Sequence, residues 1–165
     1  MPLTRAQMDA KIDEHFGFEQ ADDVDGVLAT LTFDAEHDIV GSPTGPTRGP
    51  EGARGFYEGL FADLSDGRIE TIRRLYGEDF LVDESRWTGK APGRPFGLEG
   101  RGRPLSFRLL HVVEYAADGR MKRENVWIDL ASILQQLPQC AAPGRTAGPT
   151  RSCAPARISW RRPPG

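Results

Sequence analysis

Cysteine is nearly absent from this chain of 165 residues, because its two cysteines, Cys140 and Cys153, both lie in the last 28 residues. Residues 1–137 contain none, which excludes a disulfide scaffold and a thiolate metal site there. The sequence also lacks a long apolar run, and its first residues are amphipathic and partly acidic, so neither a membrane span nor a secretory signal is expected. We therefore expect a cytoplasmic protein.

Acidic residues are missing from 138–165, a segment with five arginines and six of the 13 prolines. All 24 acidic residues lie in 1–137 beside 16 basic ones, so this part has a net charge of −8 and the last segment one of +5. An acidic body argues against nucleic acid or an anionic membrane as the main partner. The composition predicts one domain over 1–137 and a disordered Pro/Arg/Ala-rich tail over 138–165.

Hydrophobic spacing predicts helices in the first part of the domain and strands in the second. Thr4 and Gln7 form a capping box, and the apolar residues that follow recur at helical spacing, which predicts a helix over 4–17. Further helices are predicted from residue 24 and from Pro50. Later segments alternate as strands do, over 68–76, 79–88, 104–115 and 121–129, before a last helix over 130–137. This order predicts an α+β fold with a curved, mixed or antiparallel sheet covered on one face by helices.

The sequence has no motif of a metal site, a nucleotide site or an activated nucleophile. Its three histidines, His15, His37 and His111, are far apart, and neither HExxH nor GxSxG occurs. The remaining chemistry is that of carboxylate and imidazole groups, so we expect a site without metal or cofactor.

The hairpin around Ala117-Asp118-Gly119 decides which later residues share a sheet face. A three-residue turn with Gly119 in the left-handed conformation would place three pairs on one face: His111 with Asn125, Leu109 with Trp127, and Phe107 with Asp129. A two-residue turn would instead separate His111 from Asp129. An apolar face with a few convergent polar groups predicts a pocket.

Three segments near the end of the predicted domain have a characteristic sequence: Asp118-Gly119-Arg120, Glu124-Asn125-Val126-Trp127-Ile128-Asp129 and Leu134-Gln135-Gln136-Leu137. On these segments mainly, residues 4–137 resemble the SnoaL-like polyketide (ester) cyclases of the nuclear transport factor 2-like superfamily. This resemblance implies an α+β cone that encloses a pocket. It also implies that Asp129 is the general acid/base of an intramolecular aldol closure.

The expected site therefore has Asp129 and His111 as catalytic groups. We expect Asn125, Trp127, Phe107 and Leu109 to bind the substrate, with Asn125 and His111 as possible hydrogen-bond donors to the oxyanion. A second interpretation makes Asp129 the N-cap of the last helix, where it would have no catalytic role.

Glu84 and Arg86 share one face of their predicted strand. They form either a charged wall of the pocket or an ordinary ion pair, whereas Trp87 points to the other face.

The resemblance favours an enzyme that acts on a bulky apolar carbonyl compound such as a polyketide ester. A related isomerase, dehydratase or epoxide hydrolase, or a binding or dimerisation module without catalysis, remains an alternative. Both faces of the predicted hairpin are apolar, so a homodimer through the sheet is also expected.

Overall fold

The computed structural model describes residues 2–137, so the tail predicted over 138–165 lies outside the described residues. In chain order the main elements are α1 (Arg5–Gln20), α2 (Val24–Ala29), β1 (Leu31–Ile39), β2 (Thr47–Arg48), α3 (Gly49–Asp63), β3 (Ser65–Tyr76), β4 (Phe80–Ala91), β5 (Arg103–Tyr115), β6 (Met121–Ile128) and α4 (Leu130–Gln136). Within these residues no helix is long and apolar enough to span a membrane.

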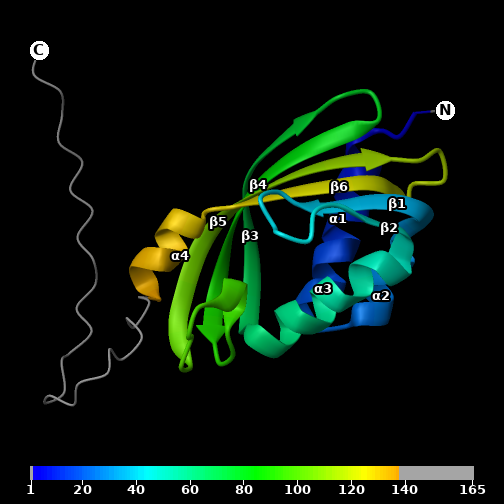
Figure 1. The fold of residues 1–165 in the computed structure, drawn as a ribbon. Helices are drawn as coiled ribbons and strands as arrows, with labels where there is room; N and C mark the ends of the chain where they lie inside the picture. The colour runs from blue at the N-terminus through cyan, green and yellow to red at the C-terminus, as the bar shows by residue number, and fades with distance from the viewer. Residues whose placement is uncertain (1, 138–165) are drawn as a thin grey trace, which may run out of the picture.

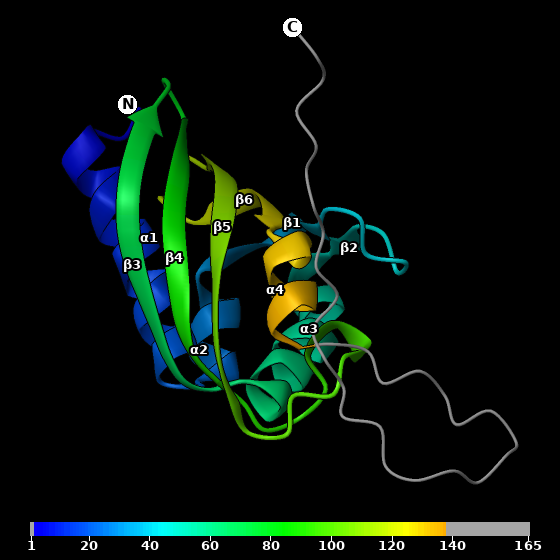
Figure 2. The ribbon, with the colours of Figure 1, turned by 90° about the vertical axis from the view of Figure 1, so that its left-hand side faces the viewer.

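The strands form one curved sheet in the order β2-β1-β6-β5-β4-β3. Neighbouring strands are antiparallel except β1 and β6, which run parallel. Figure 1 shows α1, α2 and α3 together on one side of the bent sheet, with α4 at its other end. In the rotated view the long strands β3, β4 and β5 bend along their length (Figure 2). The predicted α+β fold with a curved sheet is therefore confirmed.

Helix α1 begins at the predicted capping box. The Thr4 hydroxyl accepts a hydrogen bond from the Gln7 backbone N–H, and the Gln7 side chain accepts one from the Thr4 N–H. The helix continues to Gln20 and buries Met8, Ile12, His15 and Phe16 against the sheet. His15 is fully buried.

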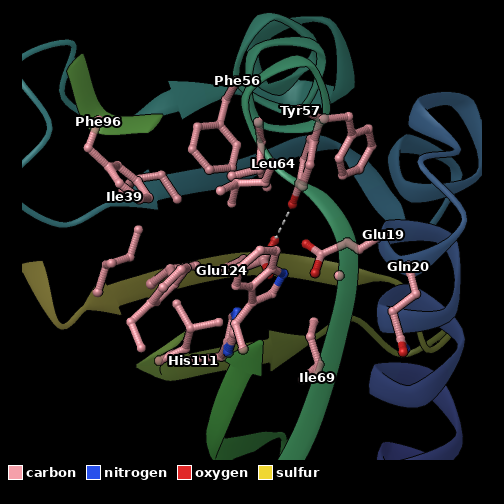
Figure 3. Close-up of a pocket in the computed structure, with 18 of the residues that line it drawn as sticks. Glu19, Gln20, Ile39, Phe56, Tyr57, Leu64, Ile69, Phe96, His111 and Glu124 are labelled. Atoms are coloured by element: carbon pink, nitrogen blue, oxygen red, sulfur yellow. Dashed lines mark hydrogen bonds between the residues drawn. The ribbon is translucent and has the colours of Figure 1, made fainter. Parts of the chain in front are cut away.

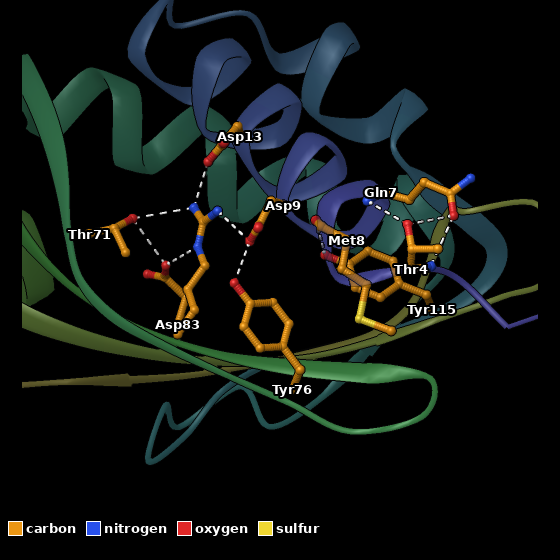
Figure 4. Close-up of polar contacts among 10 residues, drawn as sticks. Thr4, Gln7, Met8, Asp9, Asp13, Thr71, Tyr76, Asp83 and Tyr115 are labelled. Atoms are coloured by element: carbon orange, nitrogen blue, oxygen red, sulfur yellow. Dashed lines mark hydrogen bonds and ion pairs between the residues drawn. The ribbon is translucent and has the colours of Figure 1, made fainter.

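A network around Arg74 on β3 attaches α1 to the sheet (Figure 4). The guanidinium donates to the buried Asp83 of β4 at 2.9 Å, to Asp9 of α1 at 2.9 Å and to Asp13 of α1 at 2.5 Å. Tyr76 also donates to Asp9 at 2.8 Å. Because one cation connects two strands and a helix, these contacts set how α1 lies over the sheet.

The β5–β6 hairpin corrects the predicted register. Gly119 has a φ of +83°, as the predicted turn requires, and Tyr115 pairs with Met121. Lys122 is then an extra residue in β6, because Glu114 pairs with Arg123. This β-bulge moves every later pair by one residue, so His111 lies opposite Val126 and Leu109 opposite Ile128.

Helix α4 covers the edge of β5 beyond the end of β6. The Gln136 side-chain amide donates to the Ser106 carbonyl at 2.6 Å and accepts from the Ser106 N–H at 3.0 Å. Gln136 thus replaces the missing strand partner at this position, while Ile133 and Leu137 enter the core.

Candidate functional site

A chamber lies between the inner face of the sheet and helices α1 and α3 (Figure 3). Its volume is about 60 Å³, roughly the space of two water molecules. A second cavity of about 580 Å³ adjoins it, and both are lined by Ile39, Phe56, Leu60, Phe96 and Ile128. A larger ligand must therefore extend past these side chains into the outer cavity.

Three of the predicted site residues line the chamber. His111, Leu109 and Phe107 alternate along β5 and face inwards. The ring of Phe107 stacks on Trp87 with 5.2 Å between the ring centroids. Trp87, which was expected on the face away from the site, therefore belongs to the chamber wall.

Asn125 and Trp127 were predicted to share the face of His111, and that placement was wrong. The bulge at Lys122 turns both to the outer face of the sheet. There the Asn125 amide donates to Asp38 at 3.2 Å, and Trp127 is 42% exposed. Neither residue lines the chamber.

Asp129 is also outside the chamber, at the start of α4. Its carboxylate accepts a hydrogen bond from the backbone N–H of Ser132 at 3.0 Å, which makes it the N-cap. This geometry matches the second of the two interpretations of Asp129 from the sequence. The predicted pairing of Asp129 with Phe107 on the face of His111 was wrong for the same reason as that of Asn125, because the Asp129 N–H donates to the Arg108 carbonyl.

Glu84 and Arg86 face outwards from β4 and do not line the chamber. Glu84 forms an ion pair with Arg108 of β5, not with Arg86. The inner positions of β4 are those of Asp83, Ser85 and Trp87. The charged pair therefore belongs to the outer surface of the sheet.

A buried polar cluster that the sequence did not predict lies at one end of the chamber. Glu124 of β6 is 1% exposed, and it accepts a hydrogen bond from the Tyr57 hydroxyl at 3.1 Å. His15 Nε2 lies 3.3 Å from Glu124 Oε1 and 3.4 Å from Glu19 Oε1. The spacing of four residues between His15 and Glu19 indicates that they are neighbours on one face of a helix. The sequence does not show that Glu124 faces them, because its side of the sheet depends on the β-bulge at Lys122.

His15 carries a positive charge in this cluster. The Thr30 hydroxyl donates to the Val27 carbonyl, so its oxygen accepts from His15 Nδ1–H at 2.7 Å. Burial lowers the pKa of His15, but the charges and hydrogen bonds of Glu124 and Glu19 outweigh burial and raise the pKa to about 10. Burial raises the pKa of Glu124, yet attraction to His15 holds that pKa well below its usual range.

His37 is the other buried histidine close to this cluster. It pairs in register with Glu124 across the parallel strands β1 and β6, so the two side chains share the inner face. Its ring packs against Phe56 and Tyr57, with centroid distances of 5.0 and 5.2 Å. Burial lowers its pKa, although the charge of Glu124 acts in the opposite direction. His37 is therefore neutral at pH 7.

Two buried atoms of the chamber wall have neither a hydrogen bond nor an ion pair within the described part of the chain: His37 Nε2 and His111 Nδ1. They come from two different strands, β1 and β5. Buried polar atoms are almost always paired. Their presence in one apolar chamber therefore suits a ligand that has polar groups of its own.

The cluster of His15, Glu19 and Glu124 also has the composition of a cation site. One ligand atom of each residue lies within 4.8 Å of the others. A divalent metal ion would have to displace the proton from Nε2 of His15, whose pKa is about 10. The imidazolium ion is therefore the favoured occupant at neutral pH.

The sequence matches the family model of the SnoaL-like polyketide cyclases over residues 10–137. The chain belongs to this family. The resemblance seen in the hairpin and the last helix is thus confirmed. No relative was found among the curated proteins.

Solved structures show the same fold. TsrD from Streptomyces laurentii has a TM-score of 0.71 at 20% identity, with 82% of this chain and 98% of that chain covered. A protein of Burkholderia pseudomallei described as ntf2-like has a TM-score of 0.67 at 16% identity, with 81% and 98% covered. An LEH-like epoxide hydrolase of M. tuberculosis has a TM-score of 0.62 at 17% identity, with 80% and 90% covered. At these identities the likeness establishes the nuclear transport factor 2-like fold alone.

Proposed function

We propose that this SnoaL-like protein is an acid–base enzyme that closes or isomerises an apolar carbonyl compound, with His37 as the group that moves the proton. The observation that carries the proposal is the free, buried Nε2 of a neutral imidazole in an apolar chamber. A general base works best when it is unprotonated at the working pH and within reach of the substrate. His37 meets the first condition in this fold, and its place in the chamber wall supports the second.

The reaction begins when His37 Nε2 takes a proton from the carbon next to a substrate carbonyl. The electrons of the broken C–H bond form an enolate, whose oxygen accepts a hydrogen bond from His111 Nδ1–H. The charge of ionised Glu124, next to His37 in the register, favours the imidazolium that forms. In the aldol closure implied by the family, the enolate carbon then attacks a second carbonyl of the same molecule, and His37 returns its proton to the alkoxide.

In this mechanism His37, and not Asp129, is the general acid/base. The mechanism keeps His111, Phe107 and Leu109 in contact with the substrate, because all three line the chamber. The first proton transfer also serves an isomerase or a dehydratase, so it is a step that these reactions share.

Exchange of an α-proton for deuterium isolates the shared step without the natural substrate. We expect the full-length protein to accelerate exchange of 2-tetralone, an apolar bicyclic ketone, in D₂O, followed as loss of its α-proton signal by NMR. His37→Gln should lower the rate to the uncatalysed background. Asp129→Asn is the matched control and should keep the full rate.

Two outcomes would contradict the proposal. One is normal exchange by His37→Gln, and the other is loss of exchange in Asp129→Asn. Binding of 2-tetralone to the wild-type protein without any exchange would instead favour a binding module without catalysis.

The pH dependence gives a second readout of His37. Since burial lowers the pKa of His37 from 6.5, the exchange rate should be level near neutral pH and fall only below pH 6.5, as the imidazole becomes protonated. If the exchange rate instead fell to half its maximum at a pH above 6.5, the proton transfer would belong to another group.

A further inference from the structure

The chamber is too small for the whole of a bulky ligand. Its volume is about 60 Å³, roughly the space of two water molecules, so it has room for a carbonyl group and a neighbouring carbon. His37 is 2% exposed, and its Nε2 has no hydrogen-bond partner within the described residues. This buried atom faces the chamber and calls for a ligand there. The rest of that ligand must lie outside the chamber.

The outer cavity, of about 580 Å³, has the volume of a small-molecule site, which is about 300–1,000 Å³. Figure 3 shows Phe96 and Ile39, which line both spaces, at the end of the chamber away from Glu19. Among the described residues that line the outer cavity, Asp63 is the one ionisable side chain, and its carboxylate accepts a hydrogen bond from the Arg94 N–H at 2.7 Å. The outer cavity therefore suits the neutral, apolar part of a ligand whose carbonyl end enters the chamber.

Helix α3 borders the outer cavity with two glycines, Gly55 and Gly59. They are four residues apart and so lie on the same face of the helix. A Cβ atom at either position would have no neighbour from elsewhere in the fold within 4 Å. On this side the cavity therefore extends as far as the bare backbone of α3.

The described part of the fold gives no packing reason for these two glycines. Glycine inside a helix is destabilising relative to alanine or leucine. Two other glycines of α3 are explained by their surroundings. Gly49 has a φ of +69°, and a Cβ there would lie 2.5 Å from a backbone oxygen of β1, while a Cβ at Gly52 would lie 3.3 Å from the Thr47 side chain. Gly55 and Gly59 have neither constraint, and the space that they leave belongs to the outer cavity.

We propose that Gly55 and Gly59 determine how large a substrate the protein accepts: the ring body of the substrate lies against them in the outer cavity, while its carbonyl end enters the chamber. The inference rests on the proposed function for the position of the carbonyl, and it adds the residues that set specificity. Neither glycine lines the chamber. A side chain at either position would narrow the outer cavity and leave the surroundings of His37 as they are.

Three ketones with the same reacting end test the size selection. They are cyclohexanone, 2-tetralone and the tricyclic homologue of 2-tetralone in which naphthalene replaces the benzene ring. Their affinities for the full-length protein are measured by NMR titration at neutral pH. We expect the affinity to rise about tenfold with each added aromatic ring, because each ring removes more apolar surface from water. Equal affinities for the three ketones would overturn the inference.

Gly59→Leu places a large side chain at the edge of the outer cavity. It should lower the affinity for the tricyclic ketone about tenfold and leave the affinity for cyclohexanone unchanged, which reports an intact chamber. Gly55→Leu should have the same effect. Gly17→Leu on α1 is the matched control, because a Cβ there also has no neighbour within 4 Å and Gly17 lines neither space. This control should bind all three ketones as the wild type does.

Thermal unfolding shows whether weaker binding comes from a damaged fold. Leucine favours a helix more than glycine does, so each of the three leucine variants should have a Tm at least as high as that of the wild type. A variant that is more stable but binds the tricyclic ketone less tightly supports a role of the glycine in binding. If both Gly59→Leu and Gly55→Leu bind this ketone as the wild type does, or weaken all three ketones equally, the inference is wrong.

The outcomes separate this inference from the proposed function. If Gly59→Leu weakens the tricyclic ketone alone but 2-tetralone shows no proton exchange, the size selection stands and the proposed function is wrong. If 2-tetralone exchanges and His37→Gln abolishes the exchange, while both glycine variants of α3 bind the ketones normally, the proposed function stands and the size selection is wrong.

Discussion

His15 shows how burial and pairing combine at a single residue. Its ring is fully buried, which favours the neutral form, yet the two carboxylates beside Nε2 keep it charged. A group whose pKa is raised by folding stabilises the folded state below its unfolded pKa, and the effect is lost as the pH rises through the folded value. For His15 the stabilisation is complete below pH 6.5 and disappears towards pH 10.

We predict that this loss is visible in thermal unfolding. Between pH 6.5 and 10, the Tm of the wild-type protein should fall further than that of His15→Gln, which lacks the titrating group. If His15→Gln does not fold, NMR titration of the wild-type imidazole gives the answer directly. A ring that is neutral at pH 7.5 would contradict the prediction.

Asp129 provides a second prediction for a single residue, because its side chain caps α4. Asp129→Ala should lower the free energy of unfolding by about 1 kcal/mol, whereas Asp129→Asn should change it by only a few tenths, since asparagine also caps helices. Urea denaturation measures both. Equal stability of Asp129→Ala and the wild type would argue that the cap contributes nothing.

At the scale of elements, the sequence predicts the periodic segments well and the hairpin register only in part. The capping box of α1, the turn at Gly119 and the last helix are local signals, so they can be read from neighbouring residues. The bulge at Lys122 has no local signal, because it follows from how β6 fits between β1 and β5. One extra residue therefore decides whether Glu124 or Asn125 faces the chamber.

The same limit applies to the polar cluster. His15 and Glu19 lie on α1 and Tyr57 on α3, and the sequence shows no pattern that connects them to β6. The chamber's apolar wall was easier to predict, since Phe107, Leu109 and His111 alternate along one strand.

We predict that α4 depends on Gln136 for its attachment to β5. Gln136→Ala leaves the Ser106 N–H and carbonyl without a protein partner, which should cost about 1–2 kcal/mol. Gln135→Ala is the matched control, because Gln135 is exposed. Equal denaturation midpoints for the two variants would show that the edge contact is dispensable.

At the scale of the whole molecule, the outer face of the sheet lies opposite the face that α1, α2 and α3 cover. Pairs in register place Leu75 beside Val82 and Leu110 beside Trp127 on this face. Leu75, Leu110 and Trp127 are 48%, 36% and 42% exposed. An apolar sheet face of this kind favours association with a second copy.

We therefore predict a homodimer through this face. Light scattering after size-exclusion chromatography should give twice the chain mass of 18.2 kDa, and Trp127→Glu should give the monomer. Glu58→Lys, on the exposed side of α3, should leave the dimer intact. A wild-type monomer would contradict the prediction.

The parallel pairing of β1 with β6 has a consequence for the order in which the protein folds. β6 lies in the middle of the sheet but is the last strand in the chain, so β1 has no long neighbour until the end of the domain has been synthesised. Contacts between segments so distant in sequence form slowly. We therefore expect His37 and Glu124, which are neighbours across these strands, to be among the last residues of the chamber to meet.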